Sequence, residues 1–377
     1  MTNRIREFLR TRRDDGPCVV VDLDSLNREA TDTIVSATEA LRRTARQGGP
    51  SEERLPLVAL GSAGVGKTHL FARLRRRLAQ RALLVHTRPL LGSLMTTRFL
   101  LGEVFRQLGY ESNGLTQIDV LVGTALAKAL GENARFPAAL LETLRANPGA
   151  RAEAFDQVQL QVEKRTPDLD VTYLHRLLAV PFALPVLRRS WLLWLAGKEV
   201  APAHAARMGV TDTLPEANLL TALQTLAVVA APSTPLVLVF DQLENLADAD
   251  GSGELVRAYG GLISELVERV KDLVIVEMGL SSEWGLTIVR KLTLPQRSRV
   301  DGPKLRLELP DPDQRRKLLE LWASRLPRPE KPFPWPFTVE QLDQVCKPEG
   351  TTPRMLLQDL GRALRGELEA PGLAPPP

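Results

Sequence analysis

The stretch PLVALGSAGVGKTHL, residues 56–70, decides how this chain folds. It contains the phosphate-binding pattern Gly-x-x-x-x-Gly-Lys-Thr at residues 61–68, preceded by an apolar run at 57–60 and followed by a helical pattern. A buried parallel strand feeds such a loop and a helix leaves it, so that backbone N–H groups and the helix N-terminus converge on one phosphate. Glycines allow positive φ angles, the lysine reaches the β- and γ-phosphates, and the threonine hydroxyl holds Mg²⁺. The predicted nucleotide-binding residues are Gly61, Ser62, Ala63, Gly64, Val65, Gly66, Lys67, Thr68 and His69.

The composition is that of an ordinary globular protein. With 377 residues, 44% hydrophobic and 25% charged, the chain suits two domains or one large α/β domain with an insertion. The net charge of +4 permits contact with DNA without arguing for it. Two cysteines, Cys18 and Cys346, are too few for a disulfide framework, and the four histidines show no metal-ligand spacing. Because no apolar run approaches about 18 residues, we expect a cytoplasmic protein without a membrane partner.

Apolar runs alternate with helical patterns along the chain. This alternation predicts a P-loop NTPase fold, a three-layer α/β/α parallel sheet with helices on both faces. We expect strands at residues 18–23, 57–60, 81–89, from 235, from 272 and at 304–309.

The chain between the second and third core strands is long and helical in pattern. No strand is expected between Pro89 and Pro235, so we interpret this part as a large all-α insertion. After Asp311 the chain turns helical again, with Pro312 suited to a first helical turn, and forms a small C-terminal helical lid. The expected segments are 1–16 (basic arm), 17–94 (P-loop half of the core), 95–232 (helical insertion), 233–310 (second half of the core), 311–370 (lid) and 371–377 (frayed tail).

Polar residues at strand ends are candidates for the rest of the nucleotide site. Asp241 ends the most apolar strand, where a buried carboxylate is otherwise expensive, and it would hold Mg²⁺ together with Thr68. Ser281 and Ser282 close the next strand, where they could contact the γ-phosphate or the attacking water. Arg354 opens a C-terminal helix that could fold over the nucleotide. A strand-end cap, a helix cap and a surface arginine are the respective structural alternatives.

The order of these features resembles the AAA+ ATPases, especially their initiator and origin-recognition branch, and the related STAND-type switch ATPases. GKTHL is similar to the phosphate-binding sequence often found in the initiator and helicase-loader branch. DQLENL (residues 241–246) is similar to the second acidic motif of STAND-type ATPases. WLAGKEVAPAHAARMGV (194–210) resembles bacterial P-loop ATPases encoded in phage-defence, BREX-like, gene clusters. The resemblance covers residues 54–365.

The resemblance implies ATP and Mg²⁺ as cofactors and a homo-oligomeric assembly. It implies that Ser281 or Ser282 senses the nucleotide together with Arg354, and that Arg299, or with less support Arg297, is an arginine finger acting on a neighbouring subunit. The predicted catalytic residues are Lys67, Asp241, Glu244, Arg299, Arg354 and Ser281.

The chain departs from the family pattern at one important position. AAA+ proteins place a glutamate directly after the metal-binding aspartate, and this chain has Gln242. Glu244 is then the candidate for orienting water, and slow hydrolysis would favour a switch over a motor. From the given sequence we also expect no winged-helix DNA-binding domain after the lid, although such a domain is common in the initiator branch.

We therefore expect an ATP-hydrolysing regulator or remodeller, with DNA and phage defence as candidate contexts. The alternative is a nucleotide-dependent scaffold that barely cleaves ATP and docks a protein partner through its helical insertion. A GTPase is disfavoured because the guanine-reading Asn-Lys-x-Asp pattern is absent. A small-molecule kinase is disfavoured by the lid arginine and by the long route to the second acidic strand.

Helical spacing also predicts which side chains are buried. Leu70, Phe71, Leu74 and Leu78 form a buried stripe after the loop, so we expect the arginines at 73–77 to form a solvated face. His69 is expected to pack at the helix start rather than to act in catalysis. Trp191 and Trp194, three residues apart, are expected to pack between helices.

Overall fold

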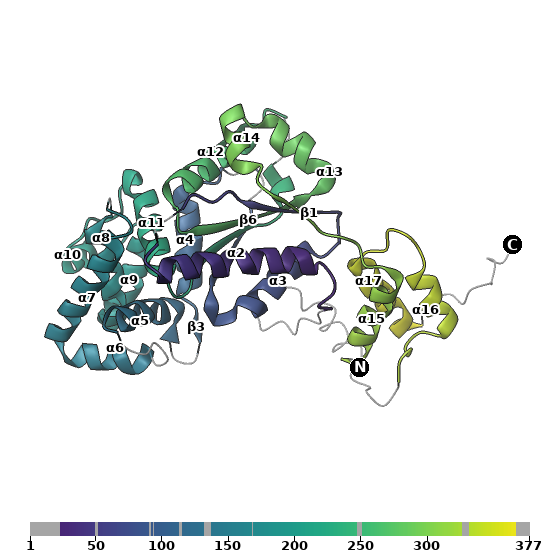
Figure 1. The fold of residues 1–377 in the computed structure, drawn as a ribbon, viewed down its shortest axis with the longest axis horizontal. Coiled ribbons are helices and arrows are strands. Elements are labelled where there is room, and N and C mark those ends of the chain that lie inside the picture. Colours follow the sequence, from purple (N-terminus) through teal and green to yellow (C-terminus); the bar gives the residue numbers. More distant parts are fainter. Residues whose placement is uncertain are drawn as a thin grey trace. The chain divides into compact units, whose positions relative to one another are not determined.

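A computed structural model of the chain describes residues 23–49, 52–89, 92, 94–112, 115–131, 137–167, 169–246, 251–325 and 332–366. The expected basic arm at 1–16, nearly all of the expected strand at 18–23 and the tail at 371–377 lie outside these residues. The fold is α/β and mostly helical, with a parallel sheet of five strands (Figure 1). Two compact units divide the chain: unit 1 comprises Met1–Thr33, Ala59–Arg77 and Leu305–Pro377, and unit 2 comprises Ile34–Val58 and Leu78–Lys304.

The five core strands confirm the predicted apolar runs. The sheet order is β2-β5-β6-β1-β7, and β2 and β5 pair in parallel with Leu83 opposite Leu236. The Val58 N–H donates to the Pro303 carbonyl at 2.9 Å where β1 lies beside β7. The strand bounds are β1 Leu57–Gly61, β2 Leu83–Thr87, β5 Leu236–Phe240, β6 Leu273–Leu280 and β7 Lys304–Arg306, the last being shorter than expected.

The sheet of unit 2 is apolar on both faces because helices cover it. Every residue of β5 is buried, as a continuous apolar run predicts for a central parallel strand. On one face, Tyr259 of α12 (Glu254–Arg269) packs edge-on against Phe240, with ring centroids 5.6 Å apart. The helix α4 (Thr97–Leu108) packs against β2. Tyr259 also donates a hydrogen bond of 2.5 Å to Glu277 of β6, a carboxyl that is fully buried.

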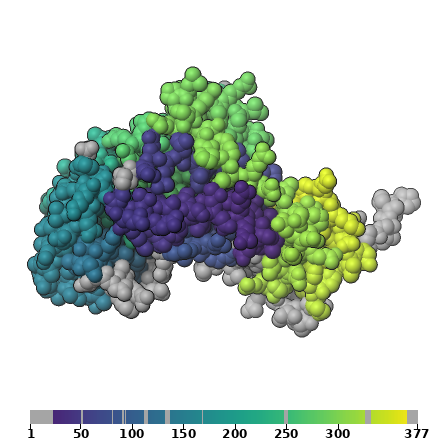
Figure 2. Space-filling model, in the orientation of Figure 1, coloured from purple at the N-terminus to yellow at the C-terminus, as the bar shows by residue number. Residues whose placement is uncertain are grey.

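The segment between β2 and β5 is a body of helices, which Figure 2 shows as a continuous blue-to-teal surface. Trp191 and Trp194 pack inside it in a T-shaped pair, as predicted. The prediction of an insertion without strands is wrong, because two short strands pair in antiparallel fashion before α5. Each strand has only two residues, which is too short to give a periodic signal in the sequence. The elements are β3 Glu111–Ser112, β4 Leu115–Thr116, α5 Gln117–Ala129, α6 Pro137–Ala146, α7 Pro148–Glu163, α8 Val171–Ala179, η2 Val180–Phe182, α9 Pro185–Leu195, α10 Pro202–Met208, η3 Glu216–Asn218 and α11 Leu219–Ala230.

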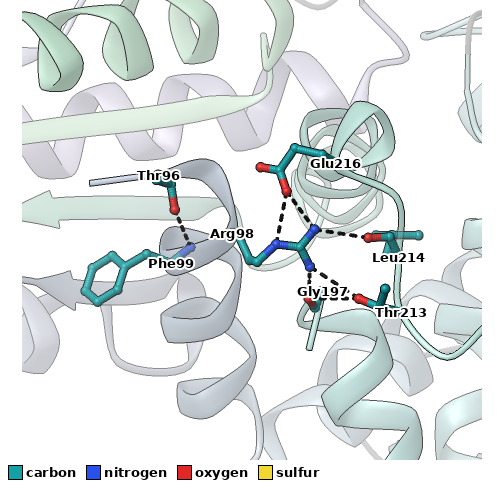
Figure 3. Close-up of polar contacts among 7 residues, drawn as sticks. All are labelled: Thr96, Arg98, Phe99, Gly197, Thr213, Leu214 and Glu216. Atoms are coloured by element: carbon teal, nitrogen blue, oxygen red, sulfur yellow. Dashed lines mark hydrogen bonds and ion pairs between the residues drawn. The ribbon is translucent and has the colours of Figure 1, made fainter. Parts of the chain in front are cut away.

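Arg98, in the first turn of α4, joins three parts of this helical body (Figure 3). Its guanidinium pairs with Glu216 at 2.6 Å and donates to the carbonyl of Leu214 at 3.3 Å and to that of Gly197. A cavity of about 740 Å³ opens beside this network, between α4 and the segments at 197–199 and 212–213.

Unit 2 ends with short helices that follow β5 and β6. They are η4 Leu243–Leu246, α13 Ser281–Glu283, the π-helical turn η5 Trp284–Ile288, η6 Val289–Lys291 and α14 Leu294–Val300, whereas the short helix η1 Ala79–Arg81 precedes β2. No described helix combines the length and the apolar character needed to cross a membrane.

Unit 1 contains the helix after the 61–68 loop, α3 (Lys67–Leu78), and three C-terminal helices with their own apolar core around Trp322 and Leu356. The three helices are α15 Pro312–Ala323, which begins at Pro312 as predicted, α16 Val339–Cys346 and α17 Pro353–Arg365. The buried Arg315 guanidinium of α15 donates to the carbonyls of Pro310, Cys346 and Pro348 at 2.6–2.8 Å, which joins α15 to the end of α16 and to the segment that follows it.

One expected surface arginine is buried in unit 1. Arg73 of α3 is 3% exposed, and its guanidinium donates to the carbonyls of Leu23 and Leu26, which precede α2 (Arg28–Arg46). The prediction of a solvated arginine face is therefore wrong for Arg73, although Arg75 is exposed. Helical spacing could not show this, because the two acceptors lie about fifty residues earlier in the chain.

Candidate nucleotide-binding site

The 61–68 loop of unit 1 runs from the last residue of β1 to the second residue of α3, as its sequence predicts. Its glycines are required by the backbone. Gly64 has φ of 79°, a left-handed conformation that side chains disfavour. At Gly61 an added Cβ would lie 2.6 Å from Val65 Cγ1 and 3.0 Å from Leu307 Cβ. Only glycine therefore permits the loop to turn this tightly against β7 and the following segment.

Lys67 and Thr68 begin α3 beside the turn of the loop. The Lys67 ammonium donates to the carbonyls of Gly61 and Ser62 at 3.1 Å each, which holds the positive charge over the loop. Thr68 is exposed, and the first turn of α3 contains no acidic residue. The first N–H groups of a helix lack intrahelical acceptors and carry partial positive charge. A lysine, a hydroxyl and a helix N-terminus therefore converge here on a position suited to an anion.

The start of α17 lies against the same loop within unit 1. A Cβ on Gly64 would meet Thr352 Oγ1 at 3.0 Å and Arg354 Cβ at 3.4 Å. Thr352 also caps α17, because its hydroxyl accepts the Met355 N–H at 3.2 Å. Arg354, which the sequence singled out as a nucleotide sensor, is thereby placed at the loop with an exposed side chain.

In unit 2, the Asp241 carboxylate stands at the end of β5 and is 1% exposed. It lies 3.3 Å from His86 Nε2 and 3.8 Å from Arg88 Nε, and it accepts the Gln242 N–H at 2.9 Å. Burial alone would raise the pKa of the Asp241 carboxyl, but its contacts with His86, Arg88 and the Gln242 N–H together hold this pKa below its ordinary value. Asp241 is therefore a buried carboxylate kept ionised, the form that a metal ligand requires.

The residues after Asp241 turn sharply. Gln242 has φ of 61°, a left-handed conformation that is strained for a residue with a side chain and that returns its N–H to Asp241. Glu244 follows in η4, and its Oε2 atom is buried without a hydrogen-bond partner in the described part of the chain. A buried carboxylate oxygen without a partner is expensive and often marks a functional group.

Sequence reasoning missed the residues at the end of β2. His86 and Arg88 contact Asp241, and the buried hydroxyl of Thr87 has no hydrogen-bond partner among the described residues. The run LLVHTR carries the same signal that identified Asp241, an apolar strand ending in polar residues. The spacing of the four histidines, which is not that of metal ligands, carries no information about a contact between His86 and Asp241.

The remaining candidates lie on surfaces of unit 2. Ser281 and Ser282 directly follow β6 and are exposed. Arg299, on α14, pairs with Glu53 at 2.7 Å and with Glu268 at 3.3 Å, and its side chain is 35% exposed. Arg297 instead donates to the carbonyls of Leu292 and Arg290. Of these two arginines, Arg299 is the one held by carboxylates at the surface.

The described residues contain no group of three or more His, Cys, Asp or Glu side chains that could hold a metal ion. A magnesium site does not require such a group, because Mg²⁺ is usually bound through one or two protein side chains together with substrate phosphates and water.

Comparison with known proteins leaves the family open. The chain matches no protein-family model and no curated protein sequence.

Proposed function

We propose that this chain is a Mg²⁺-dependent ATPase of the AAA+ or STAND-like kind. The observation that carries the proposal is the 61–68 loop, in which Lys67 is held over the backbone turn and Arg354 is placed at Gly64. A phosphate group is the ligand that such a lysine, hydroxyl and helix N-terminus bind best.

The sheet supports a role for Asp241 in the same reaction. Strands of a parallel sheet present their carboxyl ends at one edge, where ligands bind in open α/β folds. The loop follows β1, Asp241 follows β5 and Ser281 follows β6, which stands between those two strands in the sheet order.

In the proposed reaction, water attacks the γ-phosphorus of ATP, and the bond to the β,γ-bridging oxygen breaks to give ADP and phosphate. Lys67 and the loop amides stabilise charge on the phosphate oxygens, while Glu244 accepts a proton from the attacking water. Mg²⁺, when bound through Thr68 and Asp241, would neutralise charge on the β- and γ-phosphates. Ser281 and Arg354 would distinguish ATP from ADP by contact with the γ-phosphate.

The proposed output is conformational and depends on assembly. Because Thr352 and Arg354 pack on Gly64, a change in the loop on loss of the γ-phosphate would act directly on the start of α17. Arg299 would leave Glu53 and Glu268 to reach the nucleotide of a second copy. Activity would then rise with protein concentration.

The test is steady-state ATP hydrolysis across protein concentrations, with and without duplex DNA and with GTP as a comparison. Lys67→Ala, Asp241→Asn and Glu244→Gln should each lower turnover by about a hundredfold or more, as loss of transition-state stabilisation does. Glu265→Gln, which removes an exposed carboxylate from α12, is the matched control and should retain wild-type turnover. Full ATP binding and turnover in Lys67→Ala would refute the proposal.

A nucleotide-dependent scaffold is the second candidate, and Gln242 is the observation that favours it. With an amide in place of a carboxylate beside Asp241, ATP would be bound tightly and cleaved rarely. Single-turnover and multiple-turnover assays separate the two functions. Multiple turnovers that Asp241→Asn abolishes would exclude the scaffold, whereas tight binding without turnover at any concentration would establish it.

A further inference from the structure

A second cavity, of about 370 Å³, lies in unit 2 among the C-terminal ends of α2, α5, α7 and α11. Two contacts locate the cavity relative to the sheet. Ser233, which lines the cavity, lies shortly before β5, and Arg165, which also lines it, pairs with Asp272 directly before β6. Within unit 2 it therefore lies toward the amino ends of β5 and β6, whereas Asp241 follows the carboxyl end of β5. The cavity is separate from the residues assigned above to ATP.

The charges around this cavity have one sign. Arg46, Lys128, Lys164 and Arg165 line it, and no acidic side chain is among the described residues that do so. Asp272 compensates Arg165, because its two oxygens accept from the Arg165 guanidinium at 2.8 Å each. That pair is buried, so its charges balance each other and leave three positive charges facing the cavity.

Helix C-termini attract cations, and this effect accounts for only part of the cluster. Arg46 donates to the Pro232 carbonyl at 2.8 Å, and Arg165 approaches the Val228 carbonyl at 3.5 Å, both at the end of α11. In the described part of the chain, the ammonium groups of Lys128 and Lys164 make no such hydrogen bond and no ion pair.

Lys128 is placed unfavourably unless an anion accompanies it. Its side chain is half-buried near the end of α5, and burial, reinforced by the charges of Arg165 and Arg46, lowers the pKa of its ammonium group. Apolar side chains such as Val158 and Val162, together with neutral polar ones such as Thr124 and Gln161, form the rest of the wall. A ligand that fits carries several negative charges at one end and has a small apolar or neutral body.

We propose that this cavity binds a small phosphorylated molecule. A phosphate group presents several acceptor oxygens and close to two negative charges, which matches three cations that line one cavity better than a carboxylate with one charge. The cavity volume lies at the lower end of the range for small-molecule sites, which favours a compact ligand over a polymer. Because α5, α7 and α11 belong to the helical insertion, whereas α2 precedes β1 in the chain, a bound phosphate would connect the insertion to the end of α2.

The test uses pyrophosphate as the probe and the full chain carrying Lys67→Ala, so that the 61–68 loop does not contribute. Isothermal titration calorimetry at fixed ionic strength should show saturable binding, weakened at least about tenfold when Lys128→Met is added, as expected for loss of one charge-assisted contact. Lys317→Met, which removes an exposed lysine from α15, is the matched control and should leave the affinity unchanged. Methionine retains the apolar stem at position 128, so the melting temperature should not fall.

Four results would overturn the proposal. The first is no pyrophosphate binding in the Lys67→Ala chain, and the second is equal affinity in the Lys128→Met and Lys317→Met chains. The third is binding of duplex DNA that depends on Lys128 while pyrophosphate does not bind, which would assign these cations to a nucleic-acid backbone. A melting temperature lowered by Lys128→Met without a change in affinity would assign Lys128 a purely structural role and contradict ligand binding.

Discussion

Glu277 should make the stability of unit 2 depend on pH. The carboxyl group is fully buried in β6, and its Oε1 accepts the Tyr259 hydroxyl at 2.5 Å. Its Oε2 has no hydrogen-bond partner within the described residues. Burial raises the pKa of Glu277 to about 8, against the opposing effects of the Tyr259 hydrogen bond and the Lys304 charge. At neutral pH the folded chain therefore keeps a proton that the unfolded chain has lost.

The size of the effect follows from the two pKa values. The stabilisation is fully present below the unfolded pKa of 4.5 and is lost as the pH rises through about 8. At roughly 1.4 kcal/mol per pH unit, the loss across this window is about 5 kcal/mol. For a unit of roughly 250 residues, this corresponds to a fall of about 10–20 °C in melting temperature.

Thermal unfolding of wild type and Glu277→Gln from pH 4.5 to 9 measures this loss. Glutamine is neutral throughout and can still accept the Tyr259 hydrogen bond, so the two melting curves should agree near pH 4.5. By pH 8.5 the variant should be the more stable protein. Tyr259→Phe provides a second check, because removing a hydrogen bond that lowers the Glu277 pKa should move the wild-type pH dependence to higher pH. A constant difference between wild type and Glu277→Gln at every pH would refute the reasoning.

Two other substitutions test contacts described above. Gly64→Ala places a Cβ 3.0 Å from Thr352 Oγ1, at a residue whose left-handed conformation costs about 1–2 kcal/mol once a side chain is present. Titration with a fluorescent ATP analogue should therefore show an affinity about tenfold weaker than that of wild type. An unchanged affinity would contradict the proposed coupling between the 61–68 loop and α17. Arg165→Met removes the guanidinium that pairs with the buried Asp272 carboxylate and should destabilise unit 2 by about 3–5 kcal/mol in thermal unfolding. Arg165→Met combined with Asp272→Leu should recover most of this loss, and a double variant as unstable as the single one would show that the energy lies elsewhere.

The sequence was sufficient to predict elements whose pattern is local. Continuous apolar runs identified β5 and β6, and the loop pattern identified the junction of β1 and α3. Pro312 marked the start of α15 because a proline fits the first turn of a helix. The pair β3 and β4 escaped prediction because two-residue strands have no periodicity.

The candidate site divides along the same line. The position of Asp241 at the end of β5 could be predicted because a carboxylate after an apolar strand is chemically unusual, and that of Arg354 because it opens the helical pattern of α17. The roles of both residues in a nucleotide site stay predictions. His86 and the burial of Arg73 could not be predicted, because both depend on partners far away in the chain, Asp241 and the carbonyls of Leu23 and Leu26. Such contacts are set by tertiary packing, which local spacing does not encode.

The pairing of β2 with β5 also has a consequence for the order of folding. Leu83 lies opposite Leu236, so the helical body at 95–232 separates two strands that must meet. Closing so long an unstructured loop is entropically unfavourable and slows the formation of non-local pairs. The contacts among α5, α6 and α7 are local and can form first, which brings the ends of the intervening chain closer together. During synthesis, we expect the helical body to fold before the sheet is completed. The strand β2 should stay unpaired with β5 until β5 has left the ribosome.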